Sequence, residues 1–429
     1  MKDLKSILQS NLLLKITSLN VIVISIRLTV SLVIQRVLST TVGEIGIAQI
    51  GQLRNLIQIL MSTASLGIFN GVIKYVSEFR DDNQRLKDLF KTTFTFVFIG
   101  SIVTSLTVFF YASWITIELF GSLEFVNIIK LLALLPLVIG INRAFQGILN
   151  GLSDYKKYAK IDLLSYILSA TILLVCLYFY KLEGVLFSIV ITPIIQLVII
   201  LYIFGSTLKK LIKVKDLAFK IPFAKELLAF ALMSFVSTAL LNYIELDIRT
   251  MITKKIHINE AGYWTAMSFI SKNYMTFSSG LFSLYVVPKF ARIYSKHAFI
   301  YEVFYIYKTL LPLFGIGMLV VYTLREQIIA IIYPNFAGLE PLFKWQLLGD
   351  FISLATLVVA HQFLAKKMVK SFIITELISL GLFYFLSKNF IVLYGAEGVV
   401  IAHFIRSIII LVIVCFLVAR SFDNQSKIS

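Results

Sequence analysis

The sequence repeats itself once, at a spacing close to half its own length. The tripeptide Glu183–Val185 (EGV) recurs as Glu397–Val399, 214 residues later (397 − 183). The segment Tyr155–Lys160 (YKKYAK) has a similar counterpart in Ala365–Lys370 (AKKMVK). A repeat of this size is much longer than the unit of a solenoid or a propeller, so it predicts a duplicated domain.

Composition indicates that both copies lie in a membrane. Of the 429 residues, 59% are hydrophobic and only 15% are charged. Apolar runs of about twenty residues follow one another, each long enough to cross a hydrocarbon core about 30 Å thick. Lipid offers no partner for backbone N–H and C=O groups, and the runs are continuous rather than alternating, so they predict helices. We therefore expect an all-α polytopic membrane protein with about twelve transmembrane helices.

The expected helices fall into two bundles of six. They span residues 14–37, 43–73, 92–113, 126–149, 161–180 and 184–205, and then 226–250, 260–288, 300–322, 342–364, 371–389 and 396–419. Because six is even, both halves begin and end on the same face, which indicates a parallel duplication. The Lys-rich connector from Lys209 to Lys220 separates them, so the predicted lobes are residues 1–215 and 216–429.

Lys and Arg fall mostly in the connections on one side of these helices. The positive-inside rule places that side, with both the N- and C-termini, in the cytoplasm. The net charge of +17 then reflects topology and attraction to the headgroups of membrane lipids. No nucleic acid is expected as a partner, because the basic residues are dispersed over short loops. Cys176 and Cys415 lie singly in apolar runs and predict neither a disulfide framework nor a metal site.

Eight basic residues remain inside the apolar runs or at their edges: Arg27, Arg54, Lys130, Arg143, Lys272, Lys308, Lys344 and Arg406. The three lysines near helix ends, Lys130, Lys308 and Lys344, can extend their ammonium groups toward water. Arg406 has that option too, or can be buried beside a carboxylate. Arg27, Arg54 and Lys272 have long apolar stretches on both sides, and a cation at mid-membrane costs at least about 2.5–3.5 kcal/mol. A cation kept in the membrane despite this cost predicts a functional site, so these three residues are candidates for one.

Polar side chains extend these positions along two helices. The second helix carries Arg54, Gln58, Ser62 and Ser65 on one face, and the eighth carries Ser268, Lys272, Thr276, Ser279 and Ser283. The dipeptides Arg54-Asn55 and Lys272-Asn273 also correspond. Matched stripes predict two walls of an aqueous cavity. The alternative is that the hydroxyls hydrogen-bond between helices within each bundle.

The carboxylates inside the predicted helices are Asp162, Glu245, Asp247, Asp350 and Glu376. Each could pair with a buried cation or carry a coupling proton, and the sequence leaves both roles open. The cations at mid-membrane favour an anionic cargo. An anion that needs a membrane-wide cavity, in a chain without a nucleotide site, suggests a lipid-linked phosphate compound as cargo. Because no GxxxxGK[ST] loop occurs, we expect no nucleotide cofactor and cation or proton coupling.

Three segments carry a family resemblance. Gly67–Lys74 (GIFNGVIK), Trp345–Asp350 (WQLLGD) and the pair Thr375-Glu376 resemble the Wzx-type flippases of O-antigen and enterobacterial common antigen, and the resemblance spans nearly the whole chain. It implies the multidrug/oligosaccharidyl-lipid/polysaccharide exporter superfamily, a MATE-like fold and alternating access. The implied cargo is an undecaprenyl-diphosphate-linked oligosaccharide, moved from the cytoplasmic to the periplasmic leaflet of the bacterial inner membrane. A polysaccharide polymerase and chain-length proteins are possible partners.

The resemblance also suggests a site. Related peptidoglycan-precursor flippases carry basic residues on helices 1, 2 and 8, and Arg27, Arg54 and Lys272 sit at similar places. An arginine is usual at the position of Lys272, so the bidentate fork is lost there. The expected substrate-binding residues are Arg27, Arg54, Asn55, Gln58, Asn70, Lys272 and Asn273. Glu245, Asp247, Asp350 and Glu376 are the candidate coupling carboxylates, and no catalytic or metal-binding residue is expected.

Three other classes of protein fit the sequence less well. A multidrug exporter of the same superfamily would carry more carboxylates than cations in its cavity. A polymerase or ligase of the same pathway would need a large outer loop for catalytic residues, whereas the predicted outer connections are short. A scaffold would explain neither the stripes nor the buried cations. The histidines His257, His297, His361 and His403 are scattered singly and are interpreted as structural or lipid-facing.

Overall fold

The protein is described here by a computed structural model that covers residues 12–212, 219–281, 286–366 and 368–425. Within these ranges the chain forms helices and their connections, with no β-strand. Among the described residues, seven helices are long and apolar enough to cross a membrane, or eight if one bent pair is counted as a single span. The predicted all-α, multi-pass membrane architecture is confirmed. The count of about twelve and the cytoplasmic position of the termini stay predictions.

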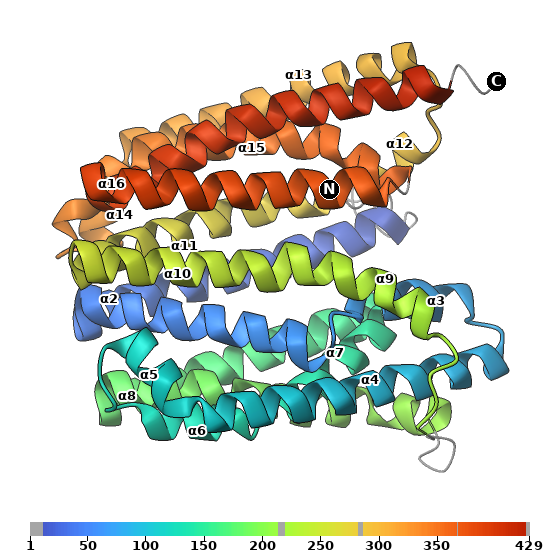
Figure 1. The fold of residues 1–429 in the computed structure, drawn as a ribbon, viewed down its shortest axis with the longest axis horizontal. Coiled ribbons are helices and arrows are strands. Elements are labelled where there is room, and N and C mark those ends of the chain that lie inside the picture. Colours follow the sequence, from blue (N-terminus) through green and yellow to red (C-terminus); the bar gives the residue numbers. More distant parts are fainter. Residues whose placement is uncertain (1–11, 213–218, 282–285, 367, 426–429) are drawn as a thin grey trace, which may run out of the picture. The chain divides into compact units, whose positions relative to one another are not determined.

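The described helices follow one another along the chain (Figure 1). They are α2 (Leu12–Ala64), α3 (Phe69–Glu78), α4 (Asn83–Phe110), α5 (Ala112–Phe120), α6 (Val126–Ala133), α7 (Pro136–Gly151), α8 (Tyr155–Leu211), α9 (Ala224–Ser234), the π-helix η2 (Phe235–Leu240), α10 (Leu241–Lys255), α11 (Ile258–Leu281), α12 (Val287–Ala291), α13 (Lys296–Thr323), α14 (Arg325–Ile332), the 3₁₀ turn η4 (Ala337–Leu339), α15 (Glu340–Ala365) and α16 (Val369–Gln425).

These elements group into two compact units. Unit 1 contains residues 1–34 and 49–243, and unit 2 contains residues 35–48 and 244–429. The middle of α2 therefore groups with unit 2, and α9 with η2 groups with unit 1. The lobe boundary between residues 215 and 216 stays a prediction.

The internal repeat is visible in the two longest helices. Both α8 and α16 contain 57 residues, and their first residues, Tyr155 and Val369, are 214 positions apart. Each contains one residue with non-helical backbone angles: Lys181 (φ 50°, ψ −132°) in α8 and Gly395 (φ 56°, ψ −136°) in α16. These two residues are again 214 positions apart. The spacing found in the sequence therefore recurs as a spacing of backbone geometry.

At these residues the chain folds back on itself. A Cβ added to Gly184 would lie 2.1 Å from the carbonyl oxygen of Cys176, and one added to Gly398 would lie 2.3 Å from that of Phe390. Residues eight apart in a straight helix are separated by about 12 Å. Each long helix is therefore a hairpin of two arms, and the two arms of α16 lie side by side in Figure 1. The glycine after each reversal permits the close approach of the arms.

A second pair of equivalent helices is α4 and α13, each of 28 residues. Both begin with a side-chain cap: Asp82 accepts hydrogen bonds from the backbone N–H groups of Gln84 and Arg85, and Ser295 accepts one from Ala298. These caps satisfy donors that the first turn of a helix leaves unpaired. Both helices are followed after one residue by a short helix, α5 or α14.

Two helices of unit 1 that the sequence predicted as continuous are broken. The predicted span 126–149 is divided into α6 and α7, which are bent by 52°, because Pro136 lacks the N–H that would continue the helix. The predicted span 43–73 breaks between α2 and α3 at Leu66 (φ 46°) and Gly67 (φ 65°). One hydroxyl serves both breaks: Ser101 Oγ lies 3.1 Å from the Pro136 carbonyl oxygen and 3.3 Å from that of Ala64.

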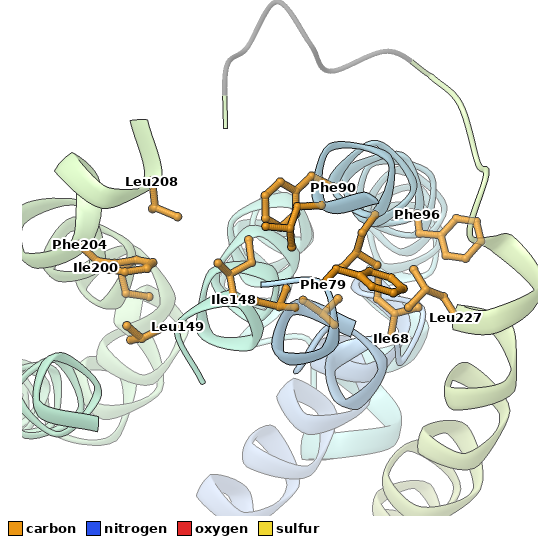
Figure 2. Packing of buried hydrophobic residues seen from close by; sticks show 14 of the residues in the cluster. Ile68, Phe79, Phe90, Phe96, Ile148, Leu149, Ile200, Phe204, Leu208 and Leu227 are labelled. Atoms are coloured by element: carbon orange, nitrogen blue, oxygen red, sulfur yellow. The ribbon is translucent and has the colours of Figure 1, made fainter. Parts of the chain in front are cut away.

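Each unit has its own apolar core. In unit 1 the core joins α3, α4, α7, the second arm of α8 and the start of α9. Figure 2 shows Phe79 and Ile68 beside Leu227, with Phe204 and Ile200 on α8. In unit 2 a separate core joins α12, α13, α15 and the second arm of α16 through residues such as Phe290 and Val414. The charged residues of interest lie on helices that these two cores position.

Candidate functional site

A charged cluster in unit 1 lies along one face of the first arm of α8. Tyr158, Asp162 and Tyr166 are four residues apart, so they share that face. Arg27 from α2 donates through Nη1 to Asp162 Oδ2 at 2.6 Å, and its guanidinium carbon lies 4.9 Å from the centre of the Tyr166 ring. The Arg27 side chain remains 43% exposed. The structure thus holds the predicted cation Arg27 in place and leaves it accessible.

Arg143 belongs to the same cluster. It lies on α7 with its guanidinium carbon 3.9 Å from the centre of the Phe69 ring. Its Nε is buried and has no hydrogen-bond partner among the described residues. Tyr158 is within electrostatic reach of both Arg27 and Arg143. Sequence reasoning counted Arg143 among the cations in apolar runs but gave it no role. The signal that could have found it is its place well inside such a run, next to the polar Asn142.

The other predicted binding residues of unit 1 differ in their exposure. Gln58 and Asn70 are exposed, Arg54 is half-buried and Asn55 is buried. Ser62 and Ser65, predicted to continue the polar stripe of Arg54, are also buried. The Ser65 hydroxyl donates to the carbonyl of Met61 at 2.7 Å. The stripe therefore ends inside the protein, and the Ser65 hydroxyl bonds a carbonyl of its own helix instead of facing water.

In unit 2 the predicted cation Lys272 is paired with a carboxylate. Its Nζ lies 3.0 Å from Glu245 Oε2, with side-chain exposures of 63% for Lys272 and 14% for Glu245. The neighbouring Asn273 has a buried Nδ2 with no hydrogen-bond partner in the described part of the chain. Asp247 is half-buried. Of the predicted stripe on this helix, the side chain of Ser279 and all of Ser283 lie outside what the structure describes.

Asp350 is the centre of a buried network in unit 2. It lies on α15 and is 4% exposed. One carboxylate oxygen accepts from Ser271 Oγ at 2.6 Å and also from the hydroxyl of Tyr274, both on α11. Gln346 Nε2 donates at 3.1 Å, one turn earlier on α15. A buried carboxylate is tolerated only when such donors surround it. Asp350, one of the candidate carboxylates predicted from the sequence, is therefore buried and surrounded by hydrogen-bond donors.

The second arm of α16 supplies the rest of this network. His403 Nε2 lies 3.0 Å from Asp350 Oδ1, and Arg406 Nη2 lies 2.7 Å from His403 Nδ1. His403 is thus not lipid-facing, which was one of the two interpretations made from the sequence. Arg406 lies within electrostatic reach of Glu376 on the first arm of α16. This fits the expectation of a buried cation near a carboxylate.

The carboxylates of the two units occupy related positions. Asp162 on α8 and Glu376 on α16 are 214 residues apart, so they are equivalent in the repeat. Asp162 pairs with Arg27, and Glu245 pairs with Lys272. Pairing with a cation is therefore observed for these two carboxylates. A coupling role for Glu245, Asp247, Asp350 or Glu376 stays a prediction.

Comparison with known proteins agrees on one family and one fold. Residues 50–336 match the family described as "Polysaccharide biosynthesis protein". The chain is 26% identical over 397 residues to the Lipid III flippase of Escherichia coli (strain K12), covering 91% of this chain and 94% of that protein. The flippase of the same name from Shigella flexneri matches equally well.

Two solved structures show the fold. One is an inward-facing multidrug resistance MATE family transporter of the MOP superfamily, with a TM-score of 0.76 at 13% identity, covering 94% of this chain and 96% of that chain. The other is the Lipid II flippase MurJ in an inward closed conformation, with a TM-score of 0.70 at 17% identity, covering 93% and 87%. The predicted MATE-like fold is confirmed.

Proposed function

The chain belongs to the polysaccharide biosynthesis protein family, and on that premise we propose that it is a flippase for a lipid-linked oligosaccharide. The observation that carries the proposal is the match to the Lipid III flippases, which extends over 91% of the chain. The protein moves an undecaprenyl-diphosphate-linked oligosaccharide from the cytoplasmic to the periplasmic leaflet of the bacterial inner membrane. It is a transporter and not an enzyme.

The charged cluster of unit 1 supplies the chemistry that a diphosphate requires. A guanidinium carries five N–H donors, and the pairing of Arg27 with Asp162 uses Nη1. The remaining donors suit phosphate oxygens, which arginine binds in a fork geometry. Asp162 and Tyr166 hold the guanidinium in place, so less side-chain entropy is lost when cargo binds. We assign diphosphate binding to Arg27 and Arg54, with Arg143 as a third cation on the same unit.

Sugar binding falls to neutral polar side chains. Gln58 and Asn70 are exposed in unit 1, and in unit 2 the amide of Asn273 has a buried donor without a partner in the described residues. Amide groups suit sugar hydroxyls because they both donate and accept hydrogen bonds. Lys272 and Asn55 complete the proposed substrate-binding set. The polyprenyl tail remains in lipid, and transport proceeds by alternating access.

A reconstituted system tests the proposal. Vesicles carrying an undecaprenyl-diphosphate-linked oligosaccharide are treated from outside with a glycosidase that cannot cross the membrane. Without protein only the outer leaflet is trimmed, and with the wild-type chain we expect trimming to reach the inner leaflet as well. Arg27→Ala and Arg54→Ala should abolish this extra trimming, because the diphosphate then lacks the cations that bind it and does not cross.

The matched control is Lys130→Ala, which removes an exposed lysine at the end of α6 and should leave trimming at the wild-type level. Wild-type protein that folds but trims no more sugar than empty vesicles would refute the proposal. Efflux of a cationic dye by the same vesicles would favour a multidrug exporter instead.

A further inference from the structure

His403 lies between two partners that make opposite demands on its ring. Its Nε2 lies 3.0 Å from a carboxylate oxygen of Asp350, and its Nδ1 lies 2.7 Å from Nη2 of Arg406. A guanidinium can only donate, so Nδ1 must be an acceptor and cannot carry a proton. The Nε2–H then donates to Asp350. The geometry therefore specifies a neutral imidazole in a single tautomer.

The ring is confined in this orientation. A Cβ added to Gly349 on α15 would lie 2.5 Å from Cδ2 of His403, so the imidazole lies directly against the backbone of α15. The ring of Phe383, on the first arm of α16, meets it edge to face, with centroids 6.5 Å apart and planes at 80°. Rotation of the ring would meet one of these neighbours. His403 can therefore change its protonation without readily changing its place.

A proton added at Nδ1 has opposite effects on the two hydrogen bonds. The bond to Asp350 becomes a charge-assisted bond between imidazolium and carboxylate, which is stronger. The bond to Arg406 is lost, because Nδ1 becomes a donor that faces another donor. Two cations would then be in contact at low dielectric. Arg406 must leave the histidine when the proton arrives.

The charged groups around His403 favour the uptake of one positive charge. They are Asp350 on α15, Arg406 on the second arm of α16 and Glu245 on α10. Glu376 on the first arm of α16 lies near Arg406, Lys272 on α11 pairs with Glu245, and the phenol of Tyr274 bonds Asp350. The ionised forms comprise three carboxylates and two cations. One bound proton on His403 would balance them. Glu376 is the carboxylate that can then receive Arg406.

We propose that His403 is a proton-binding site in unit 2. When it is protonated, the side chain of Arg406 leaves His403, on the second arm of α16, and pairs with Glu376 on the first arm. The proton comes from water, and the only covalent bond formed is Nδ1–H. One part of this inference rests on the proposed function, namely that the proton bound by His403 is the ion that drives flipping. Proton binding itself does not depend on the cargo.

Nitrogen NMR of the full chain in lipid nanodiscs, with ¹⁵N-labelled histidine, tests the site directly. His403→Gln assigns the resonances by removing one set. At high pH we expect His403 to carry its proton on Nε2 only, and at low pH on both nitrogens. His361 is the internal control, because its Nδ1 lies 2.5 Å from the carbonyl oxygen of Leu357 and must donate. It should show the opposite tautomer.

Two variants should move the titration of His403 in opposite directions. Arg406→Gln removes the opposing cation and should raise the midpoint by roughly one to three pH units, whereas Asp350→Asn removes the attracting carboxylate and should lower it by a similar amount. A proton on Nδ1 at every pH, or shifts of the reverse sign, would overturn the proposal. If one variant fails to fold, the tautomer of the wild-type protein and the other variant decide.

A transport measurement separates this inference from the proposed function. With a pH gradient across vesicles that carry the undecaprenyl-diphosphate-linked oligosaccharide, flipping by wild-type protein should follow the gradient. His403→Gln, which keeps both hydrogen bonds of the neutral ring, should flip without responding to it. A response that persists in His403→Gln would refute the coupling. An intact NMR titration with no flipping at all would refute the function and leave the proton site standing.

Discussion

The two units treat one position of their repeat in opposite ways. In unit 1 the segment 126–151 is divided into α6 and α7, with a bend of 52° just before Pro136. The equivalent segment of unit 2, 214 residues later, is the unbroken helix α15 from Glu340 to Ala365. Pro136 corresponds to Asp350. Where one unit interrupts its backbone, the other keeps the helix straight and places a buried carboxylate.

The difference shows how a duplicated fold acquires two roles. A proline breaks the helix of unit 1, and Ser101 donates a hydrogen bond to the carbonyl oxygen of that proline. A carboxylate in unit 2 instead collects donors from three helices, α11, α15 and α16. Nothing in the shared architecture requires either choice. We infer that the cations of unit 1 serve the cargo, whereas unit 2 combines Lys272 with a site that titrates.

The largest expected effect comes from removing this carboxylate. Asp350→Ala leaves the donors of Ser271, Gln346 and His403 buried without their acceptor, and we expect a loss of on the order of 3 kcal/mol in the free energy of unfolding. Pro136→Ala at the equivalent position should change it by less than about 1 kcal/mol, because the first turn of a helix accepts either residue. Chemical unfolding in detergent measures both. Equal losses would remove the distinction drawn between the two units.

The hairpins are the region in which the units agree, so matched changes there should have matched effects. Gly184→Ala and Gly398→Ala each place a methyl group against a backbone carbonyl. We expect both to lower the free energy of unfolding by about 1–3 kcal/mol, because the two arms must separate to admit it. Thermal unfolding of the two variants side by side checks this. Gly205→Ala, on the second arm of α8 with open space around its Cβ position, is the control and should cost little.

The smallest effect is expected at the reversals themselves, where the units differ in one side chain. Gly395→Ala should cost about 1–2 kcal/mol, because a left-handed backbone disfavours a Cβ. Lys181→Gly should relieve the same strain in unit 1, offset by the greater entropy of glycine in the unfolded chain, for a net gain of less than about 1 kcal/mol. The same unfolding measurement compares them. A loss of stability in Lys181→Gly would show that the Lys181 side chain supplies contacts that outweigh its strain.

The sequence predicted the architecture because the lengths of the apolar runs and the spacing of the repeat can be read without knowing which residues are in contact. The predicted spans 161–180 and 184–205 are the two arms of α8, and 371–389 with 396–419 are those of α16. The breaks at Gly67 and Pro136 were missed because apolar residues continue through both, and composition does not register a bend. Arg27 was found because a cation inside an apolar run is costly wherever it lies.

The buried network was harder to predict because it depends on the rotation of separate helices. Ser271 with Tyr274, Gln346 with Asp350, and His403 with Arg406 are each one turn apart along their helices. Each pair is visible in the sequence, but nothing there states that the three faces converge. His403 was read as an isolated residue because Asp350, the partner of its Nε2, lies 53 positions away in the chain. Polar pairs one turn apart on several apolar helices are the signal to seek.

The reversal of each hairpin within a single residue bears on how the protein enters the bilayer. No loop separates the arms of α8 or α16, so neither arm can be placed in the membrane and anchored by a soluble connection before the other arrives. We therefore expect each 57-residue segment to insert as a pair of helices. Tags or cleavage sites used to map topology would have no chain to occupy at either tip. The unit of membrane insertion expected at these two places is a pair of helices.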